Sequence, residues 1–164
     1  MRKAAASIYA RNLSHEVVGD KCAERLEEFF NDEAETVRQV VSGAFFGMTG
    51  ERLLDLEGFI NRFIESKSFE NETDRLLRAL EESNVELPGS TCRAAERILE
   101  FLREEGTHIA YHGSVIAHSI STLIVRQYEQ ATDHAIKTRC LDLIDRMERI
   151  GYYGIGDELS KIDR

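Results

Sequence analysis

The sequence predicts an all-α protein. Leu, Glu, Arg and Ala, which favour helices, dominate the chain, whereas Val, Ile and Thr never run together long enough to indicate a sheet. Apolar residues recur at spacings of three and four almost throughout, as on one face of a helix. Proline occurs once, at Pro88. We therefore expect about eight helices joined by short connections.

The helices are expected in chain order, with start signals at several capping residues. Ser14, Ser90 or Thr91, and Asp133 are candidate N-caps, and Asp32 with Glu35 has the spacing of a capping box. Residues 66–68 are expected to form a turn, and residues 84–89 a loop. The expected helices cover residues 2–13, 14–30, 32–48, 53–64, 70–83, 90–102, 114–128 and 133–147.

Charge and cysteine content restrict the classes of partner and compartment. The chain carries 21 basic and 30 acidic side chains, for a net charge of −9. This surface repels phosphate backbones and favours a basic partner patch, so we expect no nucleic acid. No apolar run approaches the ~18 residues of a membrane span, and no signal peptide is evident. Cys22, Cys92 and Cys140 lie in apolar helical patterns without a CxxC pair, which indicates buried, reduced thiols in a cytoplasmic protein.

Four segments of the chain share a local pattern. In each, an arginine is followed by a helical apolar stripe, and in the last three a small or β-branched residue precedes the arginine. The arginines are Arg2, Arg38, Arg93 and Arg139, at intervals of 36, 55 and 46 residues. A helix pair in the common helical repeats occupies about 40–47 residues. The pattern therefore favours a chain built from repeated helical hairpins.

On these residues the chain resembles HEAT-like repeat proteins, in which Val-Arg followed by small and apolar residues marks the inner helix of each hairpin. The resemblance implies a right-handed stack of helical hairpins, a HEAT-like α-solenoid, forming one domain over residues 1–164. The uneven intervals leave an irregular α-bundle as the alternative. Ala5, Ile8 and Tyr9 form a face of the first helix that we expect another helix to cover. This expectation fits a chain that is the C-terminal part of a larger array.

The last ~30 residues carry a second resemblance. The segment from Thr138-Arg139-Cys140 to Gly154-Ile155 is similar to the closing segment of large bacterial multidomain proteins, some of which have a nucleotide-hydrolysing domain upstream. This likeness implies the position of a terminal helical cap and no chemistry. A structural C-terminal cap of a larger NTPase-type protein is therefore one functional alternative.

Candidate chemistry is confined to two histidines. His108 and His112 are four residues apart, the spacing at which two imidazoles on one helix can bind zinc, and Glu104 or Glu105 could add a carboxylate. The residues between the histidines do not form the His-Glu-x-x-His motif, so no general base is evident. A metal-dependent helical hydrolase is the second alternative, and we assign no catalytic residue and no cofactor.

The preferred interpretation is a non-catalytic protein–protein interaction scaffold. Stacked helical hairpins present a long, shallow surface to another protein or to an upstream domain. If the repeats stack regularly, Arg38, Arg93 and Arg139 occupy equivalent positions along one ridge and would contact the partner. The alternative for these three arginines is pairing with acidic residues of the adjacent repeat.

Overall fold

The chain is helical throughout the part that the structure describes. The computed structural model describes the backbone of residues 1–105, 112–150 and 160, and the side chains of residues 1–101, 116, 118–150 and 160. Those residues contain ten α-helices and one 3₁₀ helix, and no strand. The predicted all-α class is confirmed, while the HEAT-like stack of hairpins stays a prediction.

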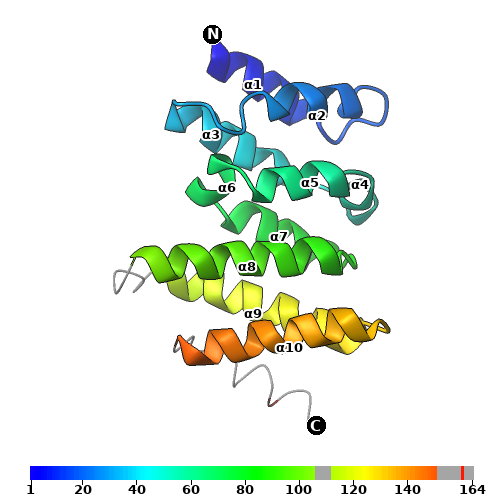
Figure 1. Cartoon of the computed structure of the whole chain (residues 1–164). Coiled ribbons are helices and arrows are strands. Elements are labelled where there is room, and N and C mark those ends of the chain that lie inside the picture. The colour runs from blue at the N-terminus through cyan, green and yellow to red at the C-terminus, as the bar shows by residue number, and fades with distance from the viewer. Residues whose placement is uncertain (106–111, 151–159, 161–164) are drawn as a thin grey trace. The chain divides into compact units, whose positions relative to one another are not determined.

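The helices belong to two compact units, Met1–Val85 (unit 1) and Glu86–Arg164 (unit 2) (Figure 1). Unit 1 contains α1 (Arg2–Asn12), α2 (Gly19–Glu27), α3 (Glu35–Ser42), the 3₁₀ helix η1 (Gly43–Phe45), α4 (Gly50–Asp55), α5 (Glu57–Ile64), α6 (Lys67–Asn71) and α7 (Asp74–Ser83). Unit 2 contains α8 (Pro88–Glu105), α9 (His112–Gln130) and α10 (His134–Arg149).

Several predicted helix ends match the structure. The carboxylate of Asp133 accepts a hydrogen bond from the Ala135 N–H at 2.8 Å, so the predicted N-cap of α10 is confirmed. Asn84 ends α7 in the left-handed conformation, at φ 50° and ψ 33°, where the loop was expected. Asparagine tolerates this conformation better than most residues. The N-cap predicted at Ser90 or Thr91 is wrong, because α8 already begins at Pro88, whose missing N–H costs nothing at the first position of a helix.

Other helix boundaries differ from the prediction, because turns interrupt the apolar pattern. α2 begins at Gly19 rather than after Ser14, and α3 ends at Ser42 and continues only as η1. The capping box predicted for Asp32 is wrong: Ala34 is the N-cap of α3, and the Asp32 carboxylate instead accepts from the Ala34 N–H at 2.9 Å. Past η1, Gly47 has a φ of 69°, which favours glycine.

The region around Ser68 forms the short helix α6, where a simple turn was expected. The Ser68 N–H and hydroxyl both donate to the Phe30 carbonyl oxygen, at 3.1 and 2.8 Å. The Ser42 hydroxyl in turn donates to the Ser68 carbonyl oxygen at 2.9 Å. These bonds join residues far apart in the sequence, so local periodicity could not predict them. The expected helix over 53–64 is likewise divided, into α4 and α5, with Leu56 between them.

Five phenylalanine rings fill the centre of unit 1. Phe63 lies between the others, with ring centroids 4.7 Å from Phe45, 5.7 Å from Phe30 and 5.8 Å from Phe69. Phe59 completes the cluster at 5.1 Å from Phe30. All five are buried. Rings at such tilted and edge-on angles stabilise a core beyond the area they bury, so this cluster holds the turn after α2, η1, α5 and α6 together.

Arg52, a partly buried residue of α4, connects this helix to the chain between α1 and the start of α2. Arg52 Nε–H donates to the Leu13 carbonyl oxygen at 3.1 Å, and Nη2 lies 2.8 Å from Asp20 Oδ1. The guanidinium and the Leu13 carbonyl both lie close to Gly19: a β-carbon there would lie 2.4 Å from Arg52 Nη2 and, more restrictively, 2.5 Å from the Leu13 backbone carbonyl oxygen, which cannot shift cheaply. A glycine is therefore required at the start of α2.

Unit 2 is a three-helix arrangement in which α8, α9 and α10 each contact the other two (Figure 1). Its core is made of aliphatic and sulfur-containing side chains. The buried members include Ala95, Ile98, Leu99, Ile120, Leu123, Ile124, Cys140, Leu143, Ile144 and Met147. The predicted stripes of these helices supply most of this core, as 3.6-residue periodicity requires.

Candidate functional site

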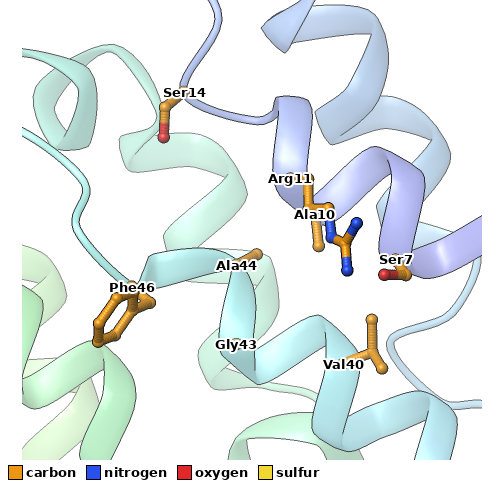
Figure 2. A pocket seen from close by; sticks show the side chains of 8 residues that line it. All are labelled: Ser7, Ala10, Arg11, Ser14, Val40, Gly43, Ala44 and Phe46. Carbon is orange, nitrogen blue, oxygen red and sulfur yellow. The ribbon is translucent and has the colours of Figure 1, made fainter.

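An open groove lies on unit 1 between α1 and the α3–η1 segment (Figure 2). Its volume is ≈300 Å³. It is lined by Ser7, Ala10, Arg11, Ser14, Val40, Gly43, Ala44 and Phe46. Both walls consist mainly of small residues at helical spacing, so the two helices leave a hollow between them instead of filling it.

The two walls follow directly from helix periodicity. Ser7, Ala10 and Arg11 are spaced three and four residues apart, as are Val40, Gly43 and Ala44 on the opposite side. Residues at these spacings share one face of a helix. Because α1 contacts both α3 and η1, the two faces meet. In Figure 2 the Arg11 side chain extends from α1 toward Val40, so a cation lies over an otherwise apolar floor.

The electrostatics of α1 differ from those of the chain as a whole. Residues 1–13 contain Arg2, Lys3 and Arg11 and no acidic side chain, although the net charge is −9. Arg2 Nη1 lies 3.4 Å from Asp32 Oδ2. Arg11 is exposed and has no hydrogen-bond or ion-pair partner among the described residues. This wall of the groove therefore offers an uncompensated positive charge.

Phe46 and Gly43 complete the groove at η1. The side chain of Phe46 is 79% exposed, next to the fully buried Phe45. An aromatic ring left in water beside a hollow is a feature of contact surfaces. Gly43 has ordinary helical backbone angles, and a β-carbon built there would meet no atom within 4 Å. The groove thus has free space at its floor and an apolar contact at its end.

The three arginines predicted as a contact surface have different surroundings. Arg38 Nη1 donates to the carbonyl oxygens of Asp32 at 2.7 Å and Glu33 at 3.0 Å, so it ties down the loop before its own helix. Arg139 forms a bidentate ion pair with Glu96 on α8, through Nε–Oε1 at 2.8 Å and Nη2–Oε2 at 2.7 Å. Arg93 is exposed on α8. The alternative for these residues, pairing with an acidic side chain of another helix, is seen at Arg139, while Arg38 Nε also donates to Asn71 Oδ1 on α6.

The helix starts before Arg38 and Arg139 resemble one another only in part, since Asp133 is the N-cap of α10 whereas Ala34, not Asp32, is the N-cap of α3. In each, an aspartate six residues earlier, Asp32 or Asp133, accepts a hydrogen bond from the N–H two residues on. The arginine then projects from the first turns of the following helix. The partners of the two arginines differ: Arg38 binds the carbonyl oxygens of Asp32 and Glu33 and, through Nε, Asn71 Oδ1 on α6, whereas Arg139 binds the Glu96 carboxylate. The internal similarity suggested by the sequence stays a prediction.

The candidate metal ligands cannot be placed. His108 and the side chain of His112 lie outside the described residues. Among the side chains that are described, no three His, Cys, Asp or Glu residues are grouped so as to hold a metal ion. The predicted burial of Cys22, Cys92 and Cys140 is confirmed.

The groove residues could not be identified from the sequence, where one face of α1 was expected to pack against another helix. Ala6 is the buried residue of this helix and its C-cap Leu13 is buried too, while Ile8 is 60% exposed. The available signal was the excess of basic residues in the first helix of an acidic chain. No sequence signal distinguished Phe46 from Phe45, because burial of one ring depends on the turn that follows η1.

Comparisons with known proteins assign no relative to this chain. No family model matches it, and neither the curated proteins nor the solved structures contain a significant match. In the described part of the chain, no helix combines the length and apolar character required to span a membrane.

Proposed function

We propose that this chain is a protein–protein interaction module, and that unit 1 binds a short peptide segment of another protein in the groove between α1 and α3–η1. The observation that carries this proposal is the combination, in one hollow, of the unpaired Arg11, the exposed Phe46 and the open space at Gly43. This combination supplies charge, apolar contact and room for a side chain.

The chemistry of the groove selects an acidic and apolar segment. A volume of ≈300 Å³ is at the small end of the roughly 300–1,000 Å³ typical of ligand sites, so it holds one or two side chains rather than a folded domain. A peptide carboxylate would pair with Arg11, whose guanidinium can bind both carboxylate oxygens. An adjacent Leu or Phe would fill the space over Val40 and Ala44 and contact Phe46.

An acidic peptide differs in charge from the basic partner patch that the net negative charge of the chain favours. Net charge averages over the whole surface, whereas binding depends on the potential at the contact. Because α1 carries only basic charges, an acidic segment is attracted locally even though the rest of the chain is acidic. The acidic remainder would then discriminate against partners that are acidic over a large surface.

The experiment compares two sets of short synthetic peptides on the purified full chain. One set combines Asp or Glu with Leu or Phe, and the other replaces every acid with Lys. We expect binding, by fluorescence anisotropy of labelled peptides, from the acidic set alone. Arg11→Glu should reduce that binding at least tenfold, which corresponds to about 1.4 kcal/mol. Equal binding of both sets would contradict the proposal.

A filled groove provides the matched control. Gly43→Leu places a side chain in the open space and should abolish binding; its β-carbon meets no atom within 4 Å, and circular dichroism checks that the fold is retained. Gly58→Leu introduces the same residue on α5, outside the groove, where the nearest atom is Arg62 Nη1 at 3.5 Å. Gly58→Leu should bind as the unaltered chain does. Undiminished binding by Gly43→Leu would show that the groove is not the site.

A further inference from the structure

Two cysteines of unit 2 lie in direct contact. Cys92 on α8 and Cys140 on α10 are 48 residues apart in the sequence, yet their sulfur atoms are separated by only 3.8 Å. Their exposed fractions are 1% and 0%. A disulfide has an S–S length of about 2.05 Å, so closure from 3.8 Å requires an approach of only about 1.8 Å.

An ion pair beside the thiols holds the two helices in this register. Glu96 follows Cys92 by one helical turn, and Arg139 immediately precedes Cys140. The bidentate bond between Glu96 and Arg139 therefore spans the same two helices as the sulfur contact. A pairing with two parallel hydrogen bonds fixes orientation as well as distance. The proximity of the thiols is thus supported by a second contact.

The two thiols are chemically unequal. The hydrogen bond from Cys140 lowers the pKa of the Cys92 thiol; burial opposes this, and the charge of Arg139 acts with the hydrogen bond. Cys140 has its pKa raised by this bond to Cys92, and burial adds to the effect. One sulfur is therefore disposed to become the thiolate, which is the nucleophilic form, while the other retains its proton.

We propose that Cys92 and Cys140 form a peroxide-sensitive dithiol that closes to a disulfide between α8 and α10. The Cys92 thiolate attacks one oxygen of hydrogen peroxide, the O–O bond breaks, and hydroxide leaves, which gives a sulfenic acid. The Cys140 sulfur then attacks the Cys92 sulfur, and the sulfenic oxygen leaves as water with the Cys140 proton. Hydroxide takes up the proton that Cys92 released, so two thiols and one peroxide yield one disulfide and two waters.

Burial determines which oxidant reaches this pair. Glutathione disulfide is a large, charged molecule, and an in-line attack on it needs an exposed sulfur. Hydrogen peroxide is nearly as small as water and needs only a brief local opening of the helix contact. The disulfide would link α8 to α10, between which α9 lies in the sequence. It would therefore reduce the conformational freedom of unit 2. This site is separate from the groove in unit 1, so neither proposal depends on the other.

The test counts thiols in the full chain after treatment with hydrogen peroxide. The reduced protein is exposed to a molar excess of peroxide, quenched with catalase, denatured and titrated with DTNB. The chain has three cysteines, and we expect one thiol to remain, with Cys92 and Cys140 joined in a non-reducing peptide map. The midpoint of thermal unfolding should rise, and dithiothreitol should reverse both changes.

Cys22 is the internal control, because it is buried in unit 1 and no sulfur contact is described for it. It should keep its thiol while the pair is lost. Cys140→Ala should form no intramolecular disulfide and should leave a Cys92 sulfenic acid that dimedone labels.

Three results would overturn the proposal: survival of all three thiols, loss of Cys22 at the same rate as the pair, or disulfides only between chains. The first two are read on the unaltered protein, so the proposal stays open to refutation even if Cys140→Ala does not fold.

Discussion

Arg139 and Glu96 face one another across α10 and α8, with both guanidinium-to-carboxylate hydrogen bonds shorter than 2.9 Å. The arginine was identified from the sequence as one of a repeated series. Its role in the structure is to align two helices within unit 2. Arg38 instead binds the backbone of the loop before its own helix and, through Nε, the side chain of Asn71 on α6.

Replacing Arg139 should weaken unit 2. Arg139→Lys keeps the charge but loses the planar fork, so we expect the free energy of unfolding to fall by about 1 kcal/mol, a value that allows for partial solvent screening. Urea unfolding followed by circular dichroism measures this. Arg149→Lys is the matched control, because Arg149 pairs with Asp145 on the exposed side of the same helix. If the two variants lost equal stability, the bidentate geometry would have no special effect.

The Glu96 carboxylate should give unit 2 an acid-sensitive component. Its hydrogen bonds to Arg139 hold the pKa of Glu96 below the usual value of 4.5. A carboxyl group with a lowered pKa in the folded state stabilises above its unfolded pKa, and this contribution is lost as the pH falls through the folded pKa. Glu96→Gln should therefore flatten the decline of unfolding free energy below about pH 4.5. An unchanged slope in urea titrations over that range would argue against it.

The start of α2 should tolerate no side chain larger than hydrogen. In Gly19→Ala the new carbon would lie 2.5 Å from the Leu13 carbonyl oxygen, which is backbone and cannot move cheaply. We expect a loss of about 2 kcal/mol, the cost of an overpacked site. Gly43→Ala, in open space, should be neutral or stabilising by about 0.5 kcal/mol. Denaturation midpoints of the two variants would then move in opposite directions.

Substitutions of Phe45, in η1, and of Phe46, which follows it, should separate an effect on stability from an effect on binding. Phe45→Ala removes a ring that is fully buried against Phe63 and should cost about 3–5 kcal/mol. Phe46→Ala removes an exposed ring and should leave unfolding unchanged while it weakens binding of the acidic peptides. A large loss of stability in Phe46→Ala would show that this ring serves the fold.

The left-handed backbone at the C-terminal end of α7 should make alanine unfavourable there. Asn84 has a positive φ of 50°, which costs a residue such as alanine about 1 kcal/mol or more. Asn84→Ala should lower the unfolding free energy by at least about that amount, whereas Asn84→Gly should lose less, because glycine adopts a positive φ without strain. Thermal unfolding of both variants tests this, and equal midpoints would contradict it.

The main helices could be predicted because each depends on its own residues. Asp133 caps α10, Asn84 ends α7, and the apolar stripes at Leu76, Leu77 and Leu80 are buried as expected. The failures occur where a distant group decides the local structure. Ser68 bonds to the Phe30 carbonyl oxygen and creates α6, and Arg52 reaches Leu13 across Gly19. No local pattern contains that information.

The candidate site shows the same division. The basic character of the first helix can be read from residues 1–13, yet the groove exists only because α1 meets α3 and η1 through small residues. Cys92 and Cys140 were each expected to be buried, but their contact could not be predicted, since 48 residues separate them. The sulfur contact and the groove each depend on how two helices pack against one another.

The amino-acid sequence by itself determined that this protein is all-α, where most of its long helices lie, and that its cysteines are buried, because helix propensity, capping and 3.6-residue periodicity act over one or two turns. Tertiary structure alone decided that Arg139 binds Glu96, that two thiols touch and that Arg11 lies over an open hollow. Those outcomes depend on which helix faces pack together, and packing selects its partners through shape and distance rather than through neighbours in the chain.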